Sequence, residues 1–132
     1  MEFHHFGLAV FDFEPAAGFF KRLGYRIGFP VADPLQNVEL VMCTSDNQPG
    51  VELIKALNEE SPVWPFLRKN NEMIYHACYR VKNIQQAMQE QFNGLRVITI
   101  SPPKPAIMFL GGTVAFYFVK GIGLIELLEI NH

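Results

Sequence analysis

Four side chains in this sequence are of the types that bind a divalent metal ion: His5, Glu52, His76 and Glu126. Each glutamate interrupts an apolar run, at residues 51–54 in one case and at residues 124–128 in the other. A carboxylate buried in such a strand is costly unless its pKa shifts or it contacts a cation. Two imidazole nitrogens and two carboxylates suit Zn, Ni, Co, Mn or Fe(II). The pattern predicts one such ion held by these four ligands, with coordination positions left for water or substrate oxygens.

Each of the four residues also has a structural interpretation when taken alone. A histidine in a strand commonly makes a hydrogen bond within the fold, and a glutamate at a strand end commonly pairs with Lys or Arg. An internal repeat favours the metal site instead. His5 aligns with His76 at an offset of 71 residues, and Val10-Phe-Asp-Phe-Glu-Pro-Ala aligns with Val81-Lys-Asn-Ile-Gln-Gln-Ala at the same offset. Val51-Glu-Leu-Ile resembles Ile125-Glu-Leu-Leu, so each half carries one early histidine and one late glutamate.

Both halves show the same order of elements that must position these residues. The first half has strand patterns at 3–10, 25–31, 38–44 and 51–55, and a helix after the N-cap Asp12 with an apolar stripe of Ala16, Phe19, Phe20 and Leu23. The second half has strands at 74–81, 96–101, 113–119 and 124–130, and a helix at 84–92 capped by Asn83. We therefore predict an α+β fold of two βαβββ modules, 1–57 and 72–132, joined by a linker segment at 58–71 whose helix starts at Ser61. The two modules are expected to form a curled mixed sheet around a metal-containing cleft, with the helices outside.

Side-chain alternation predicts which face of each strand carries the ligands. His5, Gly7 and Ala9 share one face of their strand, and the bulkier Phe6 and Leu8 share the other. By the same alternation, His4 points away from the predicted site and is interpreted as structural. Glu129 lies on the face opposite Glu126, where we expect a solvated carboxylate.

Composition excludes several classes of partner. The 132 residues are 49% hydrophobic and 18% charged, with a net charge of −2, so no basic surface for nucleic acid is expected. No apolar run approaches the roughly 20 residues that span a bilayer, and the N-terminal segment lacks the features of a signal peptide. Cys43 and Cys78 are expected to be buried thiols rather than a disulfide. These features predict a cytoplasmic protein with no membrane partner.

Several segments resemble the vicinal oxygen chelate superfamily, which includes glyoxalase I, methylmalonyl-CoA epimerase and the bleomycin-resistance proteins. They are His4-His-Phe-Gly-Leu-Ala-Val, Gly50-Val-Glu-Leu-Ile, Asn58-Glu-Glu-Ser-Pro-Val-Trp-Pro-Phe-Leu and Gly123-Leu-Ile-Glu-Leu. The Asn58 segment is most similar to the epimerase branch. The resemblance implies metal ligands at His5, Glu52, His76 and Glu126, a homodimer, and Glu126 as catalytic base as well as ligand. The chemistry implied is stabilisation of an enolate by the chelating metal.

The chain also departs from the epimerase pattern. The resemblance places a second catalytic glutamate where this chain has Pro34 or Leu35, with Asp33 as a neighbouring substitute. Two further residues are candidates for substrate binding. Lys104, in a proline-rich segment expected to be a loop, is either a carboxylate or phosphate ligand or a solvated lysine. Tyr117 is either a cleft residue or a core aromatic.

Three functions fit this pattern. The first is a metal-dependent isomerase or lyase acting on a small oxygenated acid or its acyl thioester. The second is a non-catalytic protein that binds a small molecule, as the resistance proteins of this superfamily do. The third is an extradiol-type dioxygenase, which needs two histidines and only one glutamate on Fe(II) and therefore leaves Glu52 unexplained.

Overall fold

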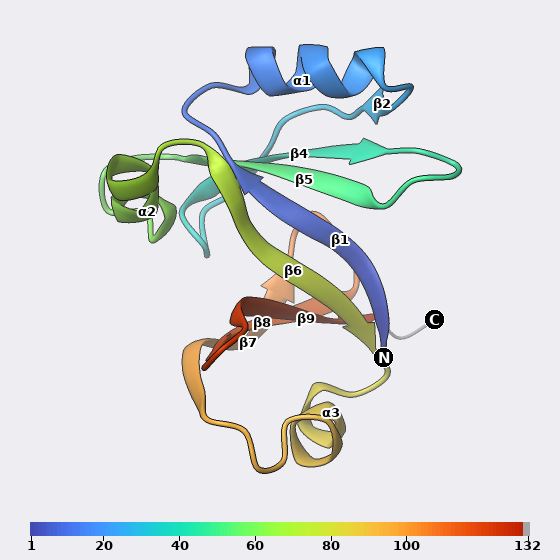
Figure 1. Cartoon of the computed structure of the whole chain (residues 1–132), viewed down its shortest axis with the longest axis vertical. Helices are drawn as coiled ribbons and strands as arrows, with labels where there is room; N and C mark the ends of the chain where they lie inside the picture. The colour runs from blue at the N-terminus through green and yellow to red at the C-terminus, as the bar shows by residue number, and fades with distance from the viewer. Residues whose placement is uncertain (131–132) are drawn as a thin grey trace. The chain divides into compact units, whose positions relative to one another are not determined.

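The computed structural model describes residues 1–130 and gives a mixed α+β fold, with three helices and nine strands in this part of the chain (Figure 1). The fold class predicted from the sequence is confirmed. None of the described helices is both long and apolar enough to span a bilayer. The chain divides into an N-terminal unit, residues 5–75, and a C-terminal unit formed by residues 1–4 and the chain from residue 76 onward.

The N-terminal unit is built around β5. Its elements are β1 (Glu2–Ala9, of which residues 5–9 belong to this unit), α1 (Phe13–Arg22), β2 (Arg26–Ile27), β3 (Val31–Asp33), β4 (Val38–Thr44), β5 (Gly50–Ala56) and α2 (Val63–Asn70). β5 pairs in parallel with β1 and antiparallel with β4, and both β2 and β3 pair with β4. One face of these strands packs against α1, which lies along β4 and β5 in Figure 1. This packing forms the core of the unit.

Asp12 occupies the predicted N-cap position of α1 in an extended conformation, but its side chain makes no capping hydrogen bond. The helix ends before Gly24, whose φ of +93° suits glycine. The predicted apolar stripe is only partly correct. Phe20 is buried and Ala16 packs on the core, whereas Phe19 and Leu23 are 57% and 46% exposed. The packed face runs through Phe13, Ala16, Ala17 and Phe20, and the helical turn leaves Phe19 and Leu23 beside it.

The predicted strand at 25–31 is interrupted. Gly28 donates its backbone N–H to the Met42 carbonyl at 2.9 Å, and a Cβ at Gly28 would lie 2.9 Å from that same oxygen. Pro30 has no N–H to continue the pairing. The segment therefore divides into β2 and β3.

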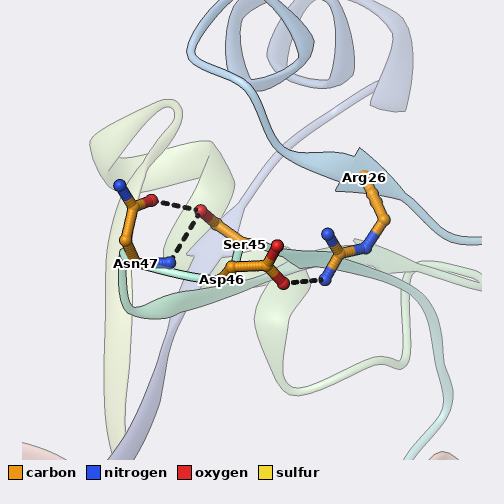
Figure 2. A network of polar contacts seen from close by, with 4 residues as sticks. All are labelled: Arg26, Ser45, Asp46 and Asn47. Atoms are coloured by element: carbon orange, nitrogen blue, oxygen red, sulfur yellow. Dashed lines mark hydrogen bonds and ion pairs between the residues drawn. The ribbon is translucent and has the colours of Figure 1, made fainter.

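The hairpin between β4 and β5 carries a small polar network (Figure 2). The Arg26 guanidinium lies 3.1 Å from Oδ1 of Asp46, while the Ser45 hydroxyl donates to Oδ1 of Asn47 at 3.0 Å. The Arg26 and Asp46 side chains are 63% and 88% exposed, so solvent screens this pair. We expect the network to shape the turn rather than to stabilise the fold.

The C-terminal unit repeats the pairing of the N-terminal unit. Its elements are β6 (Met73–Val81, from residue 76 in this unit), α3 (Ile84–Glu90), β7 (Val97–Ala106), β8 (Gly112–Val119) and β9 (Gly123–Ile130). β9 pairs in parallel with β6 and antiparallel with β8, just as β5 does with β1 and β4. The predicted N-cap of α3 is confirmed, because Asn83 Oδ1 accepts the Gln86 N–H at 2.8 Å. The duplication therefore extends from sequence to strand pairing.

β7 is longer than predicted. It runs to Ala106 and includes Pro102, Pro103 and Lys104, so the expected loop around Lys104 is wrong. β7 pairs only with β8 within the described residues, and its register shifts twice between Thr99 and Lys104. An edge strand tolerates prolines, because their missing N–H groups are not needed by a second neighbour.

Candidate functional site

The first pair of predicted ligands lies in the N-terminal unit. His5 is on β1 and Glu52 is on β5, where the parallel register aligns His5 with Gly50 and Gly7 with Glu52. His5 and Glu52 therefore share one face of the sheet, opposite the face that packs on α1. Both are buried, at 0% and 3% exposed, and His5 Nε2 lies 3.5 Å from Glu52 Oε1.

The second pair lies at the matching place in the C-terminal unit. His76 is on β6 and Glu126 is on β9. The Cα partner of Glu126 on β6 is Cys78. His76 is 2% exposed and Glu126 is 3% exposed, and His76 Nε2 lies 3.0 Å from Glu126 Oε1. The ring of Phe116, which is the partner of Glu126 on β8, lies edge-on to the His76 ring with centroids 5.3 Å apart.

The geometry of both pairs suits adjacent ligands of one ion. Metal bonds to histidine nitrogen and carboxylate oxygen are about 2.0–2.2 Å long, which places two ligand atoms about 3.0 Å apart at a 90° angle and about 3.4 Å apart at the tetrahedral angle. The observed separations are 3.0 Å and 3.5 Å. A hydrogen bond also fits the shorter one, but 3.5 Å exceeds the usual N–H···O distance. The residues present in each unit thus fit a metal ion.

Burial singles out the same residues. Among residues 1–130, six polar or charged side chains are buried: His5, Asp33, Glu52, Ser61, His76 and Glu126. Ser61 accepts the Val63 N–H at the start of α2, and Asp33 holds a turn, so a local structural role explains both. The other four are the predicted ligands. That both pairs bind one ion stays a prediction.

Asp33, the predicted substitute for a second catalytic glutamate, is occupied by its own turn. Its Oδ1 accepts the backbone N–H groups of Leu35 at 3.1 Å and Gln36 at 3.3 Å, and its Oδ2 accepts from the Gln36 side chain at 2.6 Å. Pro34 and Leu35 are exposed residues of this turn. The carboxylate of Asp33 is therefore a structural element of the β3–β4 connection.

Tyr117 does not occupy a cleft. It is 5% exposed and packs in the core beneath α3, with its ring 6.4 Å from that of Phe92. Burial raises the pKa of its hydroxyl. Its partner on β9 is Ile125, so Tyr117 lies on the face opposite Glu126. We leave it out of the site. The neighbouring Phe116 lies on the ligand face, although it was not among the residues predicted from the sequence. Strand alternation could have identified it, because alternation places Phe116 and Tyr117 on opposite faces of β8.

Lys104 lies on the ligand face of the C-terminal unit. Its partner on β8 is Val114, which in turn pairs with Leu128, two residues after Glu126 on β9. Ser101 pairs with Phe116 on the same face. Both Lys104 and Ser101 are half-buried. Lys104 lies on a strand and not in a loop. Its role in substrate binding stays a prediction.

Four further residues that the sequence singled out, Glu129, His4, Cys43 and Cys78, lie outside the two His–Glu pairs. The Glu129 carboxylate accepts the Ile84 N–H at 2.8 Å and so caps α3, which corrects the expectation of a solvated side chain. The half-buried His4 ring packs edge-on to Phe109, with centroids 5.3 Å apart, and a ring nitrogen lies within 4.8 Å of the Cys78 sulfur. Because Cys78 is the strand partner of Glu126, the expectation that His4 points away from the ligand face is wrong. Cys43 and Cys78 are buried and form no disulfide, as expected, and burial raises the pKa of the Cys43 thiol to about 11.

Comparison with known proteins identifies the family and the fold of this chain. Residues 4–116 match the family described as the Glyoxalase/Bleomycin resistance protein/Dioxygenase superfamily. An ethylmalonyl-CoA/methylmalonyl-CoA epimerase of Cereibacter sphaeroides is 36% identical over 104 residues, which are 76% of this chain and 77% of that protein. The mitochondrial methylmalonyl-CoA epimerase of Bos taurus is 36% identical over 89 residues, 66% of this chain but only 50% of the bovine protein. The crystal structure of methylmalonyl-CoA epimerase from Mycobacterium tuberculosis has the same fold, with a TM-score of 0.79 at 20% identity over 99% of this chain and 89% of that one.

Proposed function

Because this chain belongs to the glyoxalase/bleomycin resistance protein/dioxygenase superfamily, we propose that it is a metal-dependent isomerase that epimerises the α-carbon of a 2-alkylmalonyl-CoA thioester. The relatives named as epimerases support this substrate class, and the Cereibacter protein matches about three quarters of both chains. Those names favour the isomerase over the lyase. The dioxygenase alternative leaves Glu52 without a role.

One observation carries the proposal: two buried His–Glu pairs stand at equivalent positions of a duplicated module. We propose that His5, Glu52, His76 and Glu126 together hold one divalent cation. When bound, such an ion supplies positive charge that stabilises the negative charge developing on substrate oxygens. The donor set does not distinguish among Zn, Ni, Co, Mn and Fe(II).

Glu126 is assigned as the base. The α-carbon of the substrate lies between a thioester carbonyl and a carboxylate, so its C–H bond is acidic. Glu126 takes this proton, and the electron pair of the C–H bond moves onto the thioester oxygen to give an enolate. Return of a proton to the opposite face of the carbon inverts its configuration. The Glu126 side chain is 3% exposed, so little bulk water competes with the substrate for this carboxylate.

The turn of Asp33 also bears on a second candidate function. Because Asp33 holds its own turn and residues 34 and 35 are proline and leucine, the proposal assigns no residue to deliver the second proton. That observation favours, as the alternative, a non-catalytic protein that binds the same class of ligand. The predicted homodimer and cytoplasmic location are part of the proposal.

The test combines metal content with isotope exchange. Purified protein is dialysed, its metal content measured, and the protein reloaded with Co, Ni, Mn or Zn. Methylmalonyl-CoA is then incubated with it in D₂O, and NMR follows loss of the α-proton. We expect exchange that depends on metal, is abolished in Glu126→Gln and is retained in Glu129→Gln, a matched control three residues away. Metal binding and tight ligand binding without exchange would support the non-catalytic alternative, and absence of any metal binding would reject the proposed site.

A further inference from the structure

A second candidate site lies on α2, outside the His–Glu pairs. A surface groove of about 470 Å³ is lined there by Glu59, Trp64, Pro65, Arg68 and Lys69. All five residues belong to the N-terminal unit. The groove is shallow and open to solvent, so it suits the exposed end of a larger ligand and does not enclose a small molecule.

The helix builds this groove by its periodicity. Val63 and Leu67 are 0% and 1% exposed and anchor α2 in the unit. Trp64 and Arg68 are four residues apart, as are Pro65 and Lys69, so each pair stacks along the helix surface. The two rows therefore run side by side and place an aromatic ring and two cations within one groove.

Trp64 is held in place yet partly accessible. Its ring packs edge-on to that of Phe11, with centroids 6.1 Å apart, and the side chain is half-buried. Arg68 and Lys69 are exposed. An indole face offers a stacking surface for a flat aromatic ring, and a guanidinium matches phosphate geometry. The single carboxylate, Glu59, leaves the groove with a formal charge of +1.

We propose that this groove binds the adenosine phosphate end of a coenzyme A thioester, with the base on Trp64 and phosphate oxygens on Arg68 and Lys69. The inference rests on the proposed function for its substrate class. The proposed function thereby gains a nucleotide subsite, which recognises the coenzyme A part of the thioester rather than the acyl group.

The chain provides its own probe, because Trp64 is its only tryptophan. Tryptophan fluorescence is followed while the protein is titrated with coenzyme A, with adenosine 3′,5′-bisphosphate and with pantetheine. We expect saturable quenching by the first two and none by pantetheine. Arg68→Ala and Lys69→Ala should each weaken nucleotide binding about tenfold, the lower end for a charge-assisted hydrogen bond at an exposed site. Rising salt should weaken it further.

Lys21→Ala and Arg22→Ala are the matched controls. These exposed basic residues occupy the last turn of α1, as Arg68 and Lys69 do on α2. The inference is overturned if coenzyme A binds by calorimetry without changing the fluorescence, or if the α2 variants behave like the α1 controls.

Kinetics separate this inference from the proposed function. With methylmalonyl-CoA, Arg68→Ala should raise KM about tenfold and leave kcat unchanged, whereas with methylmalonyl-pantetheine it should change neither. If the wild-type protein converts neither ester, the proposed function fails while the fluorescence titration still tests the groove. If it converts both with equal KM, the nucleotide subsite alone is refuted.

Discussion

Glu126→Gln is the substitution that tests the metal site most directly. The side chain is 3% exposed and its Oε1 lies 3.0 Å from His76 Nε2, so glutamine keeps the shape and one oxygen but removes the negative charge. Loss of one charge-assisted contact at a buried site costs about 1.5–3 kcal/mol, which weakens the Kd for the ion by about 10- to 150-fold. A loss of about 2.7 kcal/mol, near the upper end, corresponds to about 100-fold.

The expected readout is the change in melting temperature on adding metal. A ligand at 100 times its Kd stabilises the folded state by about 2.7 kcal/mol, and at a concentration equal to Kd by about 0.4 kcal/mol. At about 4 °C per kcal/mol for a domain of this size, these values predict shifts of about 10 °C in the wild type and about 2 °C in Glu126→Gln. Differential scanning fluorimetry with one fixed metal concentration, with and without EDTA, measures both.

Glu129→Gln is the control for the loss of a nearby charge. It weakens the cap of α3 at the Ile84 N–H and lowers the melting temperature with or without metal, but it should leave the metal-induced shift at the wild-type value. Equal metal-induced shifts in the wild type and in Glu126→Gln would refute Glu126 as a ligand, and with it the reasoning from the two pairs.

Three further predictions concern buried residues outside the two His–Glu pairs. The Cys43 thiol is buried and its pKa is raised from 9.0 to about 11, so the stability that it contributes is present below pH 9 and is lost as pH rises from 9 to 11. Between pH 7 and pH 10 the wild type should lose about 1.4 kcal/mol more unfolding free energy than Cys43→Ala, measured by urea denaturation at both values; equal losses would contradict the assignment. Asp33→Ala should destabilise the fold by about 1–3 kcal/mol, because it removes the hydrogen-bond acceptor of the β3–β4 turn. Asp33→Asn, in contrast, should keep the rate of proton exchange within about twofold of the wild-type rate. Loss of exchange in a folded Asp33→Asn variant would make Asp33 a catalytic group. Tyr117→Ala should cost about 3–5 kcal/mol as a core truncation, while Tyr117→Phe should leave KM unchanged, and a raised KM in the latter would return this residue to the substrate site.

The sequence by itself determined which residues share a face, because strand alternation depends only on local geometry. His5, Gly7 and Ala9 lie on one face of β1 and the bulky Phe6 and Leu8 on the other, as their order predicts. The cap at Asn83 is equally local, since its acceptor reaches a backbone N–H three residues away. The internal repeat paired each histidine with a glutamate 47 or 50 residues later, and the structure brings each pair within 3.5 Å.

Only the tertiary structure decided what each face meets. Alternation separates Phe116 from Tyr117, but the pairing of β8 with β9 decides that Phe116 lies beside Glu126 and that Tyr117 packs under α3. Glu129 caps a helix 45 residues earlier in the chain, a partner that no local pattern reveals. β7 continues through three prolines because it is an edge strand, a property of the sheet and not of the segment. Local geometry sets the direction of a side chain, whereas its partner depends on contacts between segments far apart in sequence.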